Sequence, residues 1–168
     1  MNKALFLDRD GVVNVEKDYL YKREDFEFID GIFELCKHYQ DLGHMIVIVT
    51  NQSGIARKYY SKKDFELLTN WMLAEFKKKN IHISKVYYCP HHPDINIKCS
   101  CRKPEPGMIL EAKEEFNLDL THSLMIGDKE RDIEAACNAG ISQTYLFDEN
   151  NQITSSKATK TVSKLDEI

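Results

Sequence analysis

Five polar residues stand directly after, or close behind, short apolar segments of this sequence: Asp8, Asp10, Thr50, Lys103 and Asp128. A carboxylate can attack phosphorus to form an acyl phosphate, and a second carboxylate can exchange protons with the leaving oxygen and with water. A hydroxyl and an ammonium group stabilise charge on the oxygens of a transferring phosphate. These residue types therefore indicate phosphoryl transfer from a small phosphate ester.

Within this set, Asp8 suits the role of nucleophile and Asp10 that of general acid and base. We expect Asp8 to attack phosphorus, and Asp10 to protonate the leaving oxygen and then to activate water. Because a phosphate dianion repels a carboxylate, a cation has to neutralise their approach. Mg²⁺ prefers oxygen ligands, and we expect it to bridge Asp8, Asp128 and a phosphate oxygen. Thr50 and Lys103 would stabilise the remaining phosphate oxygens.

Each of these features alone also has an ordinary structural explanation. Two aspartates around an arginine usually form a solvated turn, and Thr50 could simply end a strand. Lysines such as Lys103 are most often surface charges, and a Gly-Asp pair is common between a strand and a helix. The order of the whole set along the chain, with each member near a strand end, favours a shared site over these separate explanations.

The elements that would position these residues follow from the hydrophobic pattern. Short apolar runs predict strands, and apolar residues at helical spacing predict helices between them. This alternation is typical of an α/β fold: a three-layer, Rossmann-like parallel sheet flanked by helices. Ligands bind at the carboxyl ends of the strands in such a sheet, so the polar residues would meet at one edge. The expected strands cover residues 4–7, 45–49, 86–88, 123–126 and 143–147, and the expected helices 32–42, 62–79, 106–116 and 131–138.

The remainder of the chain gives no sign of a second folding unit. Its length of 168 residues suits one domain, so we expect a single domain over residues 1–168. Residues 150–164 are rich in Ser, Thr, Asn and Lys, and form either a loosely held tail or a closing strand. Cys36 and Cys137 lie on helix faces, and we expect both in the core.

Composition limits the partners and the compartment. A net charge of −4 without a basic stripe gives no reason to expect nucleic acid. The longest apolar runs are strand-sized, which is too short to cross a bilayer. No signal peptide is visible at the N-terminus, so we expect a cytoplasmic monomer whose cysteines are reduced.

A second set of metal-ligating residues precedes Lys103 in the sequence: Cys89, His91, Cys99 and Cys101. Three thiolates and an imidazole suit tetrahedral zinc. The Cys-x-His spacing is less specific than paired Cys-x-x-Cys, so buried or free thiols remain an alternative, and His92 is a possible substitute ligand. A zinc ion here would stabilise the loop that carries Arg102 and Lys103.

Longer strings around these residues resemble the haloacid dehalogenase superfamily of phosphatases. The run from Phe6 to Val12 resembles its first motif, and Val49-Thr50-Asn51, Lys103 and Gly127 to Asp132 resemble the other three. The similarity is greatest to the branch of histidinol phosphatases and heptose-bisphosphate phosphatases. It rests on the strings Phe26 to Gly31, Thr50 to Arg57, Tyr87 to Pro93 and Cys101 to Pro104.

The resemblance implies a set of roles for individual residues. Asp8 would be the nucleophile and Asp10 the general acid and base, with Thr50 and Lys103 on the phosphate. Mg²⁺ would be held by Asp8, Asp128 and the backbone carbonyl of Asp10, and zinc by the cysteine and histidine set. No large cap domain is expected, and neither the segment after Asp8 nor that after Thr50 has room for one. Residues expected to contact substrate are Glu16, Tyr19, Asn51, Gln52, Ser53, Arg102 and Lys129.

Three hypotheses about function are open on the sequence. The first is hydrolysis of the C7 phosphate of D-glycero-D-manno-heptose 1,7-bisphosphate, in the synthesis of lipopolysaccharide precursors, with Arg102 holding the second phosphate. The second is histidinol-phosphate phosphatase, in which an acidic wall of Glu16 and Asp18 would recognise a cationic substrate. The third is a non-catalytic, zinc-stabilised binding domain, which the presence of the complete catalytic set disfavours.

Overall fold

The computed structural model describes all 168 residues. Six parallel strands form one sheet in the order β3-β2-β1-β4-β5-β6. The strands are β1 (Lys3–Leu7), β2 (His44–Asn51), β3 (Ile83–Cys89), β4 (Leu124–Gly127), β5 (Gln143–Phe147) and β6 (Lys160–Val162). The helices are α1 (Ile32–Asp41), α2 (Lys62–Lys78), α3 (Gly107–Phe116) and α4 (Glu130–Ala139), with three short 3₁₀ turns at Arg23–Asp25, Leu120–His122 and Leu165–Glu167.

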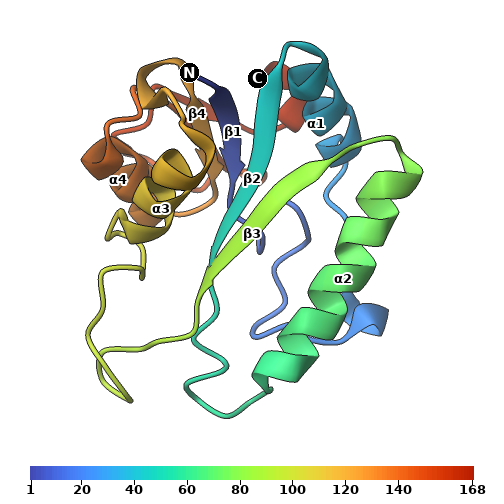
Figure 1. The fold of residues 1–168 in the computed structure, drawn as a ribbon, viewed down its shortest axis with the longest axis vertical. Coiled ribbons are helices and arrows are strands. Elements are labelled where there is room, and N and C mark those ends of the chain that lie inside the picture. Colours follow the sequence, from blue (N-terminus) through green and yellow to red (C-terminus); the bar gives the residue numbers. More distant parts are fainter.

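The helices cover both faces of the sheet, with α1 and α2 on one side and α3 and α4 on the other (Figure 1). Successive residues of β1 point to opposite faces. Leu5 and Leu7 pack in the cluster that includes the buried sides of α1 and α2, whereas Ala4 and Phe6 pack in the cluster beneath α3 and α4. This arrangement confirms the predicted three-layer α/β fold.

The element boundaries differ from the sequence-based expectation in ways that have local causes. Strand β3 begins at Ile83 rather than residue 86, because Ser84 and Lys85 interrupt its apolar run. Pro106 is the N-cap of α3 rather than part of its first turn. Ser61 caps α2 as expected, and its side chain accepts a hydrogen bond from the backbone N–H of Asp64 (3.0 Å).

The structure decides between the alternatives for residues 150–164 and corrects the expectation for Cys137. Of the alternatives for residues 150–164, the structure has a closing strand, since β6 pairs with β5. Cys137 is exposed, so the expectation that it belongs to the core was wrong, whereas Cys36 is buried as expected. None of the helices is both long and apolar enough to cross a membrane.

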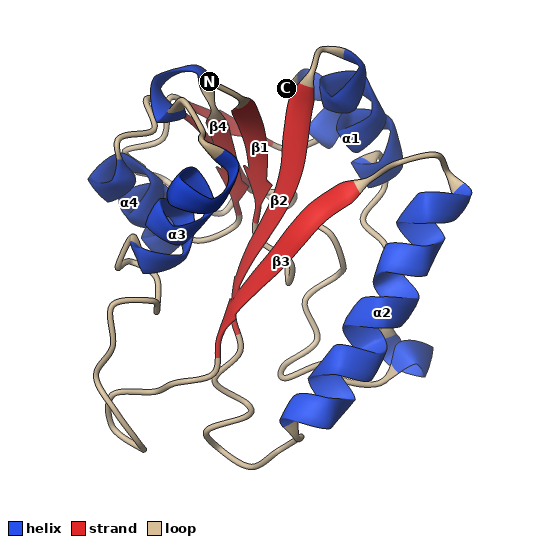
Figure 2. Cartoon of the chain, viewed as in Figure 1, coloured by secondary structure: helices blue, strands red, loops and turns tan.

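The carboxyl ends of β1, β2 and β3 point to the same end of the molecule, where long loops gather (Figure 2). The loops after β1, β2 and β3 and the turn after β4 all leave the sheet at this edge. The polar residues predicted to follow the strands are therefore brought to one place.

Candidate active site

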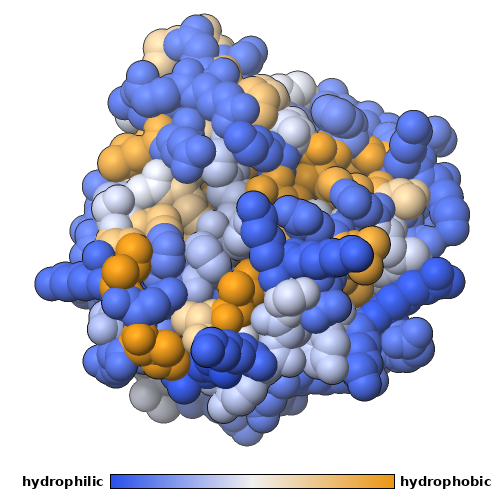
Figure 3. Space-filling view, turned by 60° about the horizontal axis from the view of Figure 1, so that its bottom comes forward, coloured by the Kyte–Doolittle hydropathy of each residue, from blue (hydrophilic) through white to orange (hydrophobic).

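A cavity of about 410 Å³ opens at this edge of the sheet. Only three of its 18 lining residues are hydrophobic, and the surface at this end of the molecule is mostly hydrophilic with scattered apolar spots (Figure 3). A cavity of this kind suits a small polar ligand. Predicted site residues that line it are Asp8, Asp10, Glu16, Tyr19, Asn51, Gln52, Ser53, Arg102, Lys103, Asp128 and Lys129.

The floor of the cavity is a buried ion cluster built around Lys103. Its Nζ donates to Oδ1 of Asp8 (2.8 Å) and to the backbone carbonyl of Val49 (2.8 Å). It also lies 2.7 Å from Oδ1 of Asp132. Lys103 therefore makes two hydrogen bonds and one further ion pair, and Asp8 is paired with a cation 95 residues further along the chain. Asp132 was not among the predicted site residues.

The carboxylates in this cluster outnumber the cation. Oxygens of Asp8, Asp128 and Asp132 lie within 4.8 Å of one another, and Oδ1 of Asp128 is buried without a hydrogen-bond partner. Burial and then the charge of Asp8 raise the pKa of Asp128 to about 9, and burial and then Asp132 raise that of Asp8 to about 6. A divalent cation bound by oxygens would relieve this repulsion, so the donor set fits Mg²⁺. Asp132 is the third acid of this group, and the backbone carbonyl of Asp10 stays a predicted ligand.

The Asp10 carboxylate is held by three donors. Its Oδ1 accepts from Nη2 of Arg9 (2.8 Å) and Nδ2 of Asn14 (3.1 Å), and its Oδ2 accepts from Nε2 of Gln52 (3.0 Å). Arg9 is almost completely buried, and its Nη2 also reaches the carbonyl of Leu20 (3.2 Å). The side chain predicted to act as general acid and base therefore has a defined orientation.

The residues after β2 connect the phosphate region to the loop of Lys103. Thr50 is fully buried, and its Oγ1 accepts from Nε2 of Gln52 (2.8 Å). Asn51 makes two hydrogen bonds to the backbone of Lys103, accepting from its N–H (3.0 Å) and donating to its carbonyl (3.2 Å). Asn51, which was predicted to contact substrate, thus also fixes the backbone beneath the Lys103 side chain.

Three arginines that line the cavity are less buried than Asp8, Arg9 and Lys103 and so form its rim: Arg57, Arg102 and Arg131. Burial and then the nearby Arg131 lower the pKa of Arg102, and Arg57 adds to this effect. Nη1 of Arg102 and Nε of Arg57 are buried without hydrogen-bond partners. A bound anion would accept hydrogen bonds from these free N–H groups and would reduce the repulsion between the neighbouring guanidinium groups. Sequence reasoning selected only Arg102, because Arg57 and Arg131 carry no spacing that links them to it.

Acidic and aromatic residues line the same cavity. Burial, followed by the charges of Asp10 and Asp8, raises the pKa of Glu16. Tyr19 lies edge-on to Tyr59 with ring centroids 4.8 Å apart, and the guanidinium of Arg57 lies 5.7 Å from the Tyr19 ring. The loop after β1 and the loop after β2 therefore touch at the mouth of the cavity.

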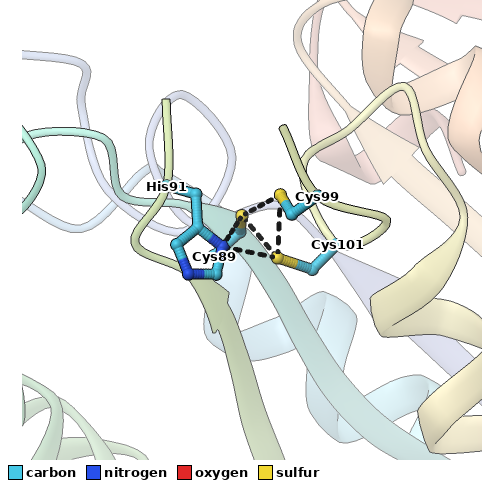
Figure 4. A group of neighbouring side chains, drawn as sticks. All are labelled: Cys89, His91, Cys99 and Cys101. Carbon is cyan, nitrogen blue, oxygen red and sulfur yellow. Dashed lines mark hydrogen bonds between the residues drawn. The ribbon is translucent and has the colours of Figure 1, made fainter. Parts of the chain in front are cut away.

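The cysteine and histidine cluster lies beside this site, at the end of β3. The side chains of Cys89, His91, Cys99 and Cys101 converge from two chain segments (Figure 4), and their ligand atoms all lie within 4.8 Å of one another. Burial opposes ionisation of Cys99, but hydrogen bonds led by that from Cys101 outweigh it and lower the pKa of Cys99 to about 6. A thiolate is the form that binds zinc, so three thiols and an imidazole in this geometry fit a tetrahedral zinc ion. His92, the possible substitute, is not part of the cluster.

Two buried residues of the site were missed by sequence reasoning. Asp132 accepts a hydrogen bond from the backbone N–H of Lys129 (3.0 Å) and so caps α4 while its other oxygen faces Lys103. An acid at the third position of a helix is typical of an N-terminal cap, and this signal could have identified Asp132. Arg9 stands between two predicted catalytic residues, but arginines in such turns are usually solvated, and nothing in the sequence distinguishes this one.

Comparisons with known proteins place this chain in a family. A family model described as HAD-hydrolase-like matches residues 100–158. The D-glycero-alpha-D-manno-heptose-1,7-bisphosphate 7-phosphatase of Campylobacter jejuni is 52% identical over 150 residues, covering 89% of this chain and 85% of that protein. The chain belongs to the haloacid dehalogenase superfamily of phosphatases. The predicted family membership is thereby confirmed.

Other relatives agree with this assignment to the haloacid dehalogenase superfamily. The D-glycero-beta-D-manno-heptose-1,7-bisphosphate 7-phosphatase of Helicobacter pylori is 49% identical and covers 89% of this chain and 86% of its own length. The structure of D,D-heptose 1,7-bisphosphate phosphatase from B. bronchiseptica, complexed with magnesium and phosphate, superposes with a TM-score of 0.85 at 28% identity. That match covers 97% of this chain and 93% of the other.

Proposed function

We propose that this protein removes the C7 phosphate of D-glycero-D-manno-heptose 1,7-bisphosphate and releases heptose 1-phosphate, a step in the synthesis of nucleotide-activated heptose for lipopolysaccharide. The observation that carries the proposal is one cavity with a carboxylate nucleophile centre at its floor and three arginines at its rim. The two ends suit the two phosphates of a bisphosphate. The relatives named above act on this substrate, as either its alpha or its beta form.

In the first half of the reaction, a carboxylate oxygen of Asp8 attacks phosphorus, and the bond from phosphorus to the C7 oxygen breaks. Asp10 gives its proton to that oxygen, so heptose 1-phosphate leaves as an alcohol and an aspartyl phosphate remains. Lys103 holds Asp8 in place through a hydrogen bond. Lys103 and the Thr50 hydroxyl both stabilise negative charge on the phosphoryl oxygens. Mg²⁺, held by Asp8, Asp128 and the Asp10 carbonyl, would supply the charge that lets the two anions meet.

In the second half, the Asp10 carboxylate takes a proton from water, and the water oxygen attacks phosphorus of the aspartyl phosphate. The bond from phosphorus to Asp8 breaks, which releases inorganic phosphate and restores both carboxyl groups to their starting state. The buried hydrogen bonds to Asp10 support this double role, because they keep its carboxylate in one orientation for both proton transfers.

The second phosphate would be bound at the arginine rim. Arg102 immediately precedes Lys103, so the loop that positions the catalytic cation also positions this recognition group. The unpartnered donors of Arg102 and Arg57 support a phosphate as the missing acceptor. Lys129 and Arg131, which flank the start of α4, add positive charge on the same side. Zinc at the Cys89 cluster would hold this loop in place.

Histidinol phosphate is the second candidate substrate, because Glu16 and Asp18 also line the cavity. Two carboxylates on a wall of the site would attract the cationic amine and imidazole of histidinol phosphate. The arginine rim would instead repel them. The balance of three guanidinium groups against these two acids favours the bisphosphate.

The test is kcat/KM for phosphate release from both anomers of the bisphosphate and from histidinol phosphate, in the native protein and in Arg102→Ala. We expect the native protein to prefer one bisphosphate anomer over histidinol phosphate by at least about a hundredfold, as charge-paired recognition allows. Arg102→Ala should lose most of that preference while keeping its activity on simple phosphate monoesters. A preference for histidinol phosphate would overturn the substrate and the role of Arg102, while leaving the aspartyl phosphate chemistry in place.

We also infer that the enzyme acts as a cytoplasmic monomer. The residues proposed for catalysis and for recognition of the second phosphate gather in one cavity of this chain, which supports activity as a monomer. Light scattering at working concentration should give a mass near 19.6 kDa. A stable dimer that loses activity on dilution would contradict this.

A further inference from the structure

The Gln52 side chain lies buried between Asp10, Thr50 and Tyr60. Its Nε2 donates to Oδ2 of Asp10 (3.0 Å) and to Oγ1 of Thr50 (2.8 Å), and its Oε1 accepts a hydrogen bond from the Tyr60 hydroxyl. Gln52 is 2% exposed and Tyr60 is 7% exposed. With both amide hydrogens engaged, Gln52 has no donor left for a phosphate or sugar oxygen.

Tyr60 determines which way this amide faces. A carboxylate can only accept hydrogen bonds, so the NH₂ group of Gln52 has to face Asp10. The Tyr60 hydroxyl, which donates to Oε1 from the other side, favours this orientation over the flipped one. In the flipped amide, Oε1 would face Oδ2 of Asp10 and repel it. Burial raises the pKa of Tyr60 to about 12, so the hydroxyl keeps the proton that it donates.

The surroundings of Tyr60 keep its hydroxyl in place. Its ring stacks on that of Tyr21, with centroids 5.5 Å apart. On another side the chain has Gly54, where a Cβ atom would lie 2.2 Å from Cε1 of Tyr60 and 2.9 Å from its hydroxyl oxygen. The glycine thus leaves the space that the tyrosine fills, and Tyr60 has little freedom to turn its hydroxyl away from Gln52.

The two oxygens of Asp10 are not equivalent in this arrangement. Oδ1 accepts from both Arg9 and Asn14, whereas Oδ2 accepts only from Gln52. Oδ2 therefore has the free lone pair that can carry a proton to or from the substrate. We propose that Gln52 and Tyr60 form a positioning pair that holds Oδ2 of Asp10 toward the leaving oxygen, an inference that rests on the proposed function. Gln52 also donates to Oγ1 of Thr50, whose own hydroxyl donates to the backbone carbonyl of Asn51 (3.5 Å), so the amide links Asp10 to the end of β2.

The experiment compares two esters that differ in their need for a proton. The sugar alkoxide of heptose 1,7-bisphosphate leaves only when protonated, whereas nitrophenolate leaves p-nitrophenyl phosphate without a proton. We expect Tyr60→Phe to lower kcat/KM for the bisphosphate by about tenfold or more, within the range that general acid catalysis contributes. The loss on p-nitrophenyl phosphate should stay within about threefold, with KM unchanged for both. Because kcat/KM covers only the steps up to departure of the leaving group, later hydrolysis of the aspartyl phosphate does not obscure the comparison.

Two further variants make the result specific. Gln52→Met keeps the side-chain volume but removes the hydrogen bonds, and should show the same selective loss. Tyr145 lies on β5, and its hydroxyl makes no hydrogen bond. Tyr145→Phe should therefore leave kcat/KM unchanged for both esters. Equal losses on both esters would show a purely structural role, and a higher KM for the bisphosphate alone would show a substrate contact. Either result overturns the positioning pair. If the native protein prefers histidinol phosphate, the proposed substrate is wrong, but the same comparison with that alkyl ester still tests the pair.

Discussion

Single residues at the floor of the cavity depend on one another through charge and space. Gly11 has a φ of +89°, and a Cβ atom there would lie 2.1 Å from Oδ2 of Asp128. Position 11 therefore needs glycine for two reasons: the turn has a positive φ, and the Asp128 carboxylate, directly after β4, occupies the space of a Cβ atom. The close approach of the Gly11 backbone fixes the position of the Asp128 carboxylate. Mg²⁺ requires such fixed ligands, because it tolerates little departure from octahedral geometry.

We expect Gly11→Ala to displace Asp128 and to raise the Mg²⁺ concentration for half-maximal activity by at least about tenfold, because one ligand is moved out of place. Gly43→Ala is the matched control, since Gly43 also has a positive φ (+82°) but nothing within 4 Å of the added Cβ atom. It should cost only about 1 kcal/mol of stability, from backbone strain. Activity is titrated with Mg²⁺, and stability is measured by thermal melting, for both variants. The same half-maximal Mg²⁺ concentration in Gly11→Ala and Gly43→Ala would contradict the role of Gly11.

At the scale of elements, the loop between β3 and α3 carries both the cysteine cluster and Lys103. It begins at Cys89 in the last position of β3 and returns through Cys101, Arg102 and Lys103 to the cavity. Its intervening residues, among them Ile95 and Ile97, are exposed, so apolar burial does little to hold it. A metal ion linking its two ends would supply the missing constraint.

Removing zinc should therefore lower stability and activity together. With a zinc-selective chelator in excess Mg²⁺, even about 3 kcal/mol of lost stabilisation would lower the melting temperature by roughly 6 to 12 °C. Phosphate release should fall in parallel and return when zinc is added back. Cys99→Ser should behave like the chelated protein, and Cys137→Ser, at an exposed thiol outside the cluster, should not. Unchanged melting and turnover after chelation would show that the cluster holds no structural metal.

The whole molecule is completed by its C-terminal residues. Val162 in β6 and Leu165 just after it are buried in the cluster beneath α1, although the segment before them is polar. Leu165→Ala should cost about 2–5 kcal/mol of unfolding free energy, as other large-to-small core changes do. Ile153→Ala, at an exposed position in the same segment, should cost under about 0.5 kcal/mol. Urea unfolding measures both, and equal small effects would mean that the C-terminal segment lies outside the core.

Much of this architecture could be predicted because it follows from local pattern. The apolar runs that end at Asp8, Thr50 and Gly127 gave the strand ends, and parallel topology then brought them to one edge. The positions of Arg57 and Arg131 beside Arg102 could not be predicted, since they depend on how distant loops fold against each other. The same holds for Asp132, whose approach to Lys103 is set by the packing of α4. Strand β6 stayed ambiguous because three residues with one buried side chain carry too little hydrophobic signal.

We propose that Asp8 removes the C7 phosphate and leaves the C1 phosphate in place. Phosphorus NMR of heptose 1,7-bisphosphate digested with the native protein and Mg²⁺ tests it most directly. We expect the C7 monoester signal to be replaced by inorganic phosphate while the C1 glycosyl phosphate signal persists, and no change with Asp8→Asn, whose neutral amide cannot attack phosphorus. Loss of the C1 signal would contradict the proposed selectivity for the C7 phosphate, and substantial turnover by Asp8→Asn would contradict Asp8 as the nucleophile.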